Sequence, residues 1–191
     1  MNTSNNPFHP STLAQRPIIA VCGAGTCNEA LAEKAEDVGR QIARAGAVLA
    51  CGGLGGVMEA ACRGAHSAGG FTLGLLPGTD CAAANPFVHL AIPTGMGHAR
   101  NVILVQTADV VLAIGGAYGT LSEIALARKT GRQVIGLDSW DLGDQGEATQ
   151  QEPHIIKAAT PTDAVALALR YLPPSRAGYT QRCAQDGSAS I

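Results

Sequence analysis

The stretch DVVLAIGGAYGTLSE, residues 109–123, decides the fold. Its first part is an almost unbroken run of aliphatic residues, which predicts a strand over 109–114 that is buried on both faces. Two glycines end the run, and the residues from Thr120 onward predict a helix over 120–130. A buried strand, a glycine turn and a helix in this order are typical of a parallel α/β sheet.

The same unit recurs along most of the chain. The periodicity of apolar residues predicts strands and helices in alternation. Strands are expected at 17–22, 47–51, 71–76, 87–92, 109–114 and 133–137, and helices at 29–45, 57–68, 99–107, 120–130 and 160–171. We therefore predict an α/β fold, a single-domain Rossmann-like doubly wound parallel sheet with helices on both faces.

The predicted domain spans residues 17–172. Residues 1–16 and 173–191 are rich in polar residues and proline without apolar periodicity, so we expect a flexible N-terminal arm and a flexible C-terminal tail. Residues 138–151 are polar and acidic with one tryptophan, which predicts a surface excursion.

Composition limits the classes of function. With 46% apolar but only 4% aromatic residues, and 24 glycines, the core must be aliphatic and its backbones must pack closely. A formal net charge of -2 disfavours nucleic-acid binding. The sequence has neither a secretory signal pattern nor an apolar run of about 18 residues, so we expect a cytoplasmic protein with no membrane partner.

The six cysteines form no CxxC pair and mostly lie in apolar segments, so they do not predict a disulfide framework or a zinc site. We expect five of them to be small core residues, and we predict no metal ligands. The cysteines are Cys22, Cys27, Cys51, Cys62, Cys81 and Cys183.

Three glycine-rich turns follow predicted strands, so they should meet at the edge of the sheet where parallel strands end. A glycine turn that leads into a helix N-terminus exposes backbone N–H groups and the positive end of the helix dipole, and it therefore suits a phosphate. The alternative is that these glycines only make tight turns. The candidate ligand residues are Gly23 and Gly25; Gly52, Gly53, Gly55 and Gly56; and Gly115, Gly116, Tyr118, Gly119 and Thr120.

The first turn does not fit a dinucleotide cofactor. Position 28 is Asn where the GxGxxG pattern requires Gly, and no acidic residue ends the second strand to hold a ribose hydroxyl.

The loop TGMGHARN, residues 94–101, places Arg100 just before a predicted helix. A guanidinium suits a planar or multi-oxygen anion, so Arg100 is a candidate ligand contact together with Met96, Gly97 and Asn101. The alternative for Arg100 is an exposed position in the first turn of a helix.

Glu123 has two interpretations. It follows the third glycine turn, where a carboxylate could act on a bound ligand. However, Thr120 and Glu123 also fit the S/T-x-x-E capping box, in which Glu123 bonds back to the backbone N–H of Thr120 and needs no ligand.

At these motifs the chain resembles the lysine-decarboxylase-like family, also called the Lonely Guy family, which has an Arg-bearing loop followed by PGGxGTxxE. Residues 116–123 match the second motif, Asp109 matches an acidic residue before the strand, and the turn at 52–56 resembles the family's other glycine-rich turn. The similarity covers about residues 17–137. It implies hydrolysis of the N-glycosidic bond of nucleoside 5'-monophosphates to base and ribose 5-phosphate, with Arg100 and Glu123 as the catalytic pair and no required cofactor.

Departures from the motifs leave an alternative. Gly115 replaces the motif's Pro, Ala117 replaces its second Gly, and Asn101 replaces a Lys. These features resemble a subgroup that includes molybdenum-cofactor carrier proteins, which bind a phosphorylated pterin as cargo without cleaving it. The hydrolase is the prediction we favour from the sequence, and a carrier or a regulatory nucleotide sensor are the alternatives. The resemblance further implies a homodimer or a homotetramer.

Overall fold

The computed structural model describes residues 16–142 and 155–175. Seven parallel strands form one sheet in the order β4-β3-β2-β1-β5-β6-β7. The strands are β1 (Ile18–Gly23), β2 (Val48–Cys51), β3 (Thr72–Leu76), β4 (Leu90–Pro93), β5 (Val110–Ile114), β6 (Gln133–Leu137) and β7 (Ile155–Ala158). The α/β Rossmann-like fold class is confirmed, whereas most of the predicted arm, tail and surface excursion lies outside the described residues.

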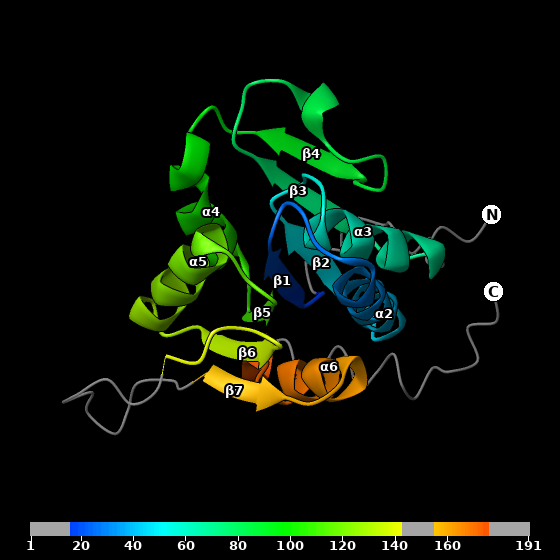
Figure 1. Cartoon of the computed structure of the whole chain (residues 1–191), viewed down its shortest axis with the longest axis vertical. Helices are drawn as coiled ribbons and strands as arrows, with labels where there is room; N and C mark the ends of the chain where they lie inside the picture. Colours follow the sequence, from blue (N-terminus) through cyan, green and yellow to red (C-terminus); the bar gives the residue numbers. More distant parts are fainter. Residues whose placement is uncertain (1–15, 143–154, 176–191) are drawn as a thin grey trace.

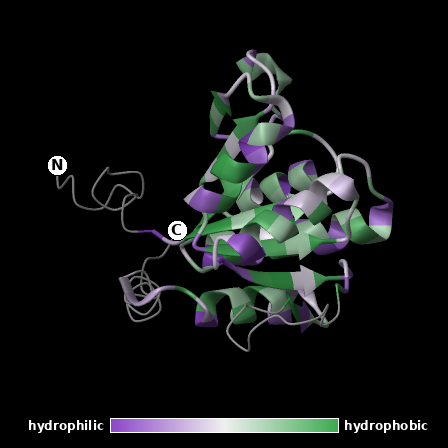
Figure 2. Ribbon diagram, turned by 90° about the vertical axis from the view of Figure 1, so that its left-hand side faces the viewer, coloured by the Kyte–Doolittle hydropathy of each residue, from purple (hydrophilic) through white to green (hydrophobic). Residues whose placement is uncertain are grey.

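Helices cover both faces of this sheet (Figure 1). One apolar core lies beneath α2, α3 and α6, and a second lies beneath α4 and α5. The helices are α2 (Glu29–Arg44), α3 (Val57–Ser67), α4 (Arg100–Thr107), α5 (Tyr118–Lys129) and α6 (Pro161–Arg170), with short 3-10 turns at η2 (Cys81–Ala83) and η3 (Gly97–Ala99). Figure 2 shows the hydrophobic residues along the strands and the inner sides of the helices.

β1 and β5 form the centre of the sheet and fix where the site lies. They pair in parallel from Ile19 with Val110 to Gly23 with Ile114. At the start of the pair, Asp109 Oδ2 accepts a hydrogen bond from the backbone N–H of Ile18 at 2.8 Å. The acidic residue before β5 therefore joins two strands at the edge opposite their glycine turns.

The structure differs from the expected elements at β4 and β7, where the apolar periodicity of the sequence is weak. β4 begins at Leu90 and not at 87, because Asn85 holds the preceding residues in a turn, where its Oδ1 accepts from the N–H of Phe87. β7 was not predicted at all, since four residues at the edge of a sheet carry too little periodicity to be recognised. Within the described residues, no helix is long and apolar enough to cross a membrane.

The cysteine prediction holds only in part. Cys22, Cys51 and Cys62 are buried, but Cys27 is only half-buried and Cys81 is exposed, so the expectation of five core cysteines is wrong. Cys183 lies outside the described residues. The described cysteines are all free thiols, and the Cys51 and Cys62 sulfurs lie 3.4 Å apart.

The contact between α2 and α3 depends on two glycines that face each other across the helix pair. A Cβ at Gly39 would lie 1.9 Å from the Ala61 carbonyl oxygen, and a Cβ at Gly64 would lie 1.8 Å from the Glu36 carbonyl oxygen. No real side chain tolerates such distances. The two helix backbones therefore touch directly, as the glycine- and alanine-rich composition predicts.

Gly39→Ala should consequently destabilise the fold. Helix propensity alone would favour alanine by about 1 kcal/mol, but the steric conflict forces α2 away from α3 and should cost about 2 kcal/mol or more net. Chemical denaturation of the variant measures this change in the free energy of unfolding. Gly78→Ala is the matched control, because a Cβ there meets no atom within 4 Å and should change stability little. A neutral or stabilising Gly39→Ala would contradict the direct backbone contact.

Candidate functional site

The three glycine turns come together where β1, β2 and β5 end. The N–H of Val57, which opens α3 after the second turn, donates to the carbonyl of Ala24 in the first turn at 3.1 Å. A Cβ at Gly56 would lie 2.4 Å from the same carbonyl oxygen. Because Gly23 pairs with Ile114, the third turn begins beside the first. The prediction that these turns share one edge of the sheet is confirmed.

Several of these glycines have a packing reason. A Cβ at Gly23 would lie 2.3 Å from Val57 Cγ1, and one at Gly53 would lie 2.7 Å from Leu76 Cδ2. In contrast, a Cβ at Gly25, Gly97 or Gly119 would meet no atom within 4 Å. The space beside these three glycines is open, so a ligand can approach the backbone there.

Arg100 begins α4, directly after η3, but it does not point into solvent. Its side chain is 9% exposed and its Nη1 donates to Glu123 Oε1 at 3.2 Å. The guanidinium covers Gly52 at the end of β2, where a Cβ would lie 2.2 Å from Nη2. The alternative of an exposed arginine in the first turn of a helix is therefore wrong.

The capping-box interpretation of Glu123 is also wrong. α5 begins at Tyr118, two residues before the predicted start, and its N-cap is Ala117, which has no side chain able to bond. Thr120 therefore lies inside the first turn, buried, and its Oγ1 has no hydrogen-bond partner among the described residues. Glu123 lies one turn further along, where it bonds to Arg100 and lies near the thiol of Cys22.

The electrostatics of the pair follow from its burial. Burial raises the pKa of Glu123, and the hydrogen bonds and charge of Arg100 and the Cys22 hydrogen bond oppose that rise only in part. Burial also raises the pKa of the Cys22 thiol, and the neighbouring Glu123 adds to the effect. The thiol therefore stays protonated beside the carboxylate. A ligand would have to displace the bond from Arg100 to reach Glu123 Oε1.

The other predicted ligand residues divide into buried and exposed groups. Asn101 is buried, and its side-chain amide donates to Ser122 Oγ at 2.9 Å, which links α4 to α5. Met96 and Tyr118 are exposed at the same end of the molecule. Across residues 16–142 and 155–175, the acidic, histidine and cysteine side chains form no group of three that could hold a metal.

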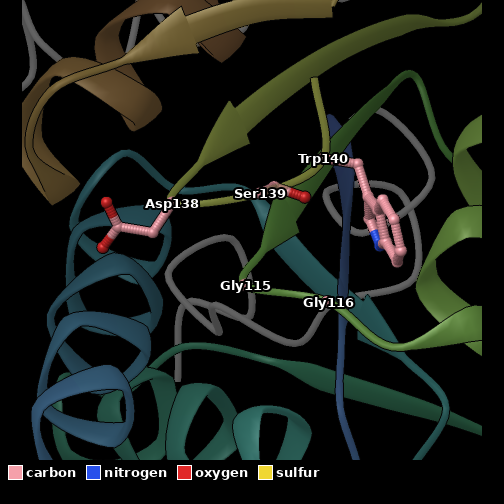
Figure 3. Close-up of a pocket in the computed structure, with 5 residues that line it drawn as sticks. All are labelled: Gly115, Gly116, Asp138, Ser139 and Trp140. Carbon is pink, nitrogen blue, oxygen red and sulfur yellow. The ribbon is translucent and has the colours of Figure 1, made fainter. Parts of the chain in front are cut away.

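A pocket of about 280 Å³ adjoins the third turn and includes residues that the sequence did not point to (Figure 3). Gly115 and Gly116 line it from β5, and Asp138, Ser139 and Trp140 line it from the loop after β6. The sequence predicts a surface excursion for these last three residues. Their position directly after a buried parallel strand was the available signal, since ligand sites in such sheets lie where strands end.

Comparison with known proteins agrees with this arrangement. The molybdenum cofactor binding protein of the phototrophic bacterium Rippkaea orientalis is 41% identical, with a TM-score of 0.73 over 80% of this chain and 94% of that one. The molybdenum cofactor carrier protein of Chlamydomonas reinhardtii is 34% identical, with a TM-score of 0.71 over 82% of this chain and 98% of that one.

Two further matches add less about function. An uncharacterised protein of Archaeoglobus fulgidus is 50% identical over 119 residues, which is 62% of this chain and 78% of that one. DNA processing protein A of Streptococcus pneumoniae, 20% identical with a TM-score of 0.61, covers 81% of this chain and 62% of its own and shares the fold alone.

The family model described as the SLOG cluster4 family matches residues 16–165, which is most of the chain and includes all three glycine turns, Arg100 and Glu123. The Lonely Guy-like resemblance and its subgroup with molybdenum-cofactor carriers are thereby confirmed, and the chain belongs to the SLOG cluster4 family.

Proposed function

We propose that this chain is a molybdenum-cofactor carrier or binding protein that holds the phosphate of the pterin at the glycine turns. The observation that carries the proposal is that α3 and α5 both begin at the edge of the sheet where the glycine turns lie, and that neither helix has a side-chain cap. By contrast, Asn28 caps α2 and Thr160 caps α6. The N–H of Val57 already donates to Ala24, but the other backbone N–H groups at uncapped N-termini provide donors and a positive dipole end for an anion.

The proteins of similar structure support the molybdenum cofactor as the cargo. Those from Rippkaea orientalis and Chlamydomonas reinhardtii, which this chain matches over nearly their whole length, bind or carry the molybdenum cofactor. The departures at Gly115, Ala117 and Asn101 pointed in the same direction. The residues present also fit the group, because open backbone at Gly25 and Gly119 gives a phosphate close access. When bound, the cofactor would supply redox chemistry to a recipient enzyme, while this chain binds and orients it.

The hydrolase that the sequence favoured receives less support from the site. A phosphoribohydrolase needs a carboxylate free to stabilise an oxocarbenium-like transition state or to activate water. Glu123 is instead buried between the Arg100 guanidinium and the Cys22 thiol. We therefore assign the pair a positioning role, in which it fixes α4 and α5 over the ends of β1 and β2.

The Glu123→Gln variant distinguishes a carrier from a hydrolase. The amide oxygen still accepts from Arg100, so the variant should fold and bind molybdenum cofactor with an affinity within about threefold of the wild type. Molybdenum analysis and pterin fluorescence of protein purified from a cofactor-producing host measure the bound cargo. Neither wild type nor variant should release base from AMP, GMP, CMP or UMP. Base release by the wild type that disappears in Glu123→Gln would establish the hydrolase and overturn the carrier.

Gly119→Asp should separate binding from stability. A Cβ there meets no atom, and an acidic residue in the first turn of a helix is favourable by about 0.3–1 kcal/mol, so the fold should be equally or more stable. The same carboxylate repels a phosphate at this helix N-terminus, so cofactor affinity should fall about tenfold or more. Gly119→Ala is the control and should bind normally. Thermal unfolding and cofactor titration of both variants test this, and unimpaired binding by Gly119→Asp would place the phosphate elsewhere.

A further inference from the structure

The pocket beside Trp140 adjoins the third glycine turn. It lies between the turn after β5 and the loop after β6, and its volume is about 280 Å³ (Figure 3). At roughly 30 Å³ for each liquid water, this is space for about nine waters and far more than one phosphate needs. It approaches the roughly 300 Å³ at which small-molecule pockets begin. This volume leaves room for a ligand larger than a phosphate.

Two aromatic side chains stand at this pocket. Trp140 is the only tryptophan in the chain, and its indole packs on Gly116, where a Cβ would lie 2.6 Å from Nε1. The Tyr118 ring lies 6.3 Å from it, centroid to centroid, and is tilted by 34°. Tyr118 is 83% exposed, so core packing does not explain it. Aromatic faces beside a pocket stack well on flat heterocycles.

Polar atoms around the same turn lack partners. Trp140 Nε1, Ser139 Oγ and Thr120 Oγ1 are each buried without a hydrogen bond to the described residues. Thr120 is only 2% exposed, and its Cβ lies 3.6 Å from where a Gly116 Cβ would be. The indole N–H can only donate, whereas the hydroxyls can donate or accept. Such a set matches a ring edge that carries a carbonyl and ring nitrogens.

Asp138 shapes the pocket without making it acidic. It has φ of 50°, an uncommon left-handed conformation that aspartate tolerates better than most residues. Its carboxylate turns away from Trp140 toward α2, where it forms an ion pair with Lys34 (Figure 3). The pair neutralises the carboxylate and holds the loop that presents Ser139 and Trp140. Backbone strain of this kind persists where surrounding contacts impose it.

From these features we infer that the pocket binds the flat nitrogen heterocycle, a pterin or a purine, of the ligand whose phosphate lies at the N-terminus of α5. The inference rests on the proposed function only for the place of the phosphate. The ring stacks on Trp140, Tyr118 closes over it from the open side, and Ser139 and the indole N–H bond to its edge.

Trp140 makes the test specific, because all tryptophan fluorescence comes from this pocket. The full chain is titrated with neopterin, with GMP and with inorganic phosphate, and N-acetyltryptophanamide serves as the control for light absorption by the ligands. At least one heterocycle should quench Trp140 saturably, and which one does so identifies the ring as pterin or purine. Phosphate alone should leave the emission nearly unchanged. Absence of saturable quenching by both heterocycles, or equal quenching by phosphate, would overturn the inference.

Variants then test the contacts by calorimetry with whichever heterocycle binds. Trp140→Leu should weaken it about tenfold or more, the range of a lost stacking contact, while Trp140→Phe and Ser139→Ala should weaken it about threefold each. Tyr171→Leu removes a half-exposed aromatic ring just past the end of α6 and should change nothing. Circular dichroism melts establish that each variant folds. If Trp140→Leu is misfolded, Trp140→Phe and Ser139→Ala decide the question, and unchanged affinity in both would overturn the inference.

The two proposals fail in different ways. Quenching by GMP in a chain that takes up no molybdenum cofactor would keep the heterocycle pocket and reject the cargo. Full cofactor retention by a folded Trp140→Leu variant, with unchanged affinity, would keep the carrier and reject the pocket.

Discussion

The buried ion pair between Arg100 and Glu123 joins α4 and α5 over the ends of β1 and β2. Arg100 belongs to α4 and lies on Gly52 at the end of β2, while Glu123 belongs to α5 and lies near the thiol of Cys22 at the end of β1. Removing two charges from water costs several kcal/mol per ion, and their attraction compensates only with good geometry and further bonds. Such a pair is weak evidence for stability. Its effect is to allow only one placement of α4 and α5 over the strands.

The ion pair limits which groups of the site are available to attract an anion. Because the Arg100 guanidinium bonds to Glu123, and Lys34 bonds to Asp138, the positive charges nearest the turns are already balanced. Attraction for a phosphate must then come from the uncapped N-termini of α3 and α5 and from the backbone at Gly25 and Gly119. Rigid backbone donors recognise the geometry of a phosphate, whereas free cations would attract any anion. A carrier that must keep and later release its cargo is consistent with such a balance.

How far the sequence could predict this molecule depends on the range of the interactions involved. Alternating apolar runs are local, so the parallel sheet and the shared edge of the glycine turns were predicted correctly. The helix start at Tyr118 was not, because Thr120 and Glu123 fit a capping box perfectly well on their own. In the structure α5 begins at Tyr118, and Glu123 bonds to Arg100, which belongs to another helix. The local sequence pattern therefore predicted the wrong first residue of α5, because it takes no account of tertiary packing.

Trp140 illustrates a different limit. Nothing in the sequence around it is periodic. Its contact with Gly116 joins the ends of two strands whose paired residues, Ile114 and Leu137, are 23 residues apart in the sequence and adjacent only in the sheet. The glycine at 116 is explained by that indole, just as Gly23 is explained by Val57 and Gly52 by Arg100. A glycine-rich turn is therefore ambiguous in sequence, because its glycines can serve the protein's own side chains or a ligand. At this edge Val57, Arg100 and Trp140 fill the space beside some of the glycines, while the space beside Gly25 and Gly119 stays open.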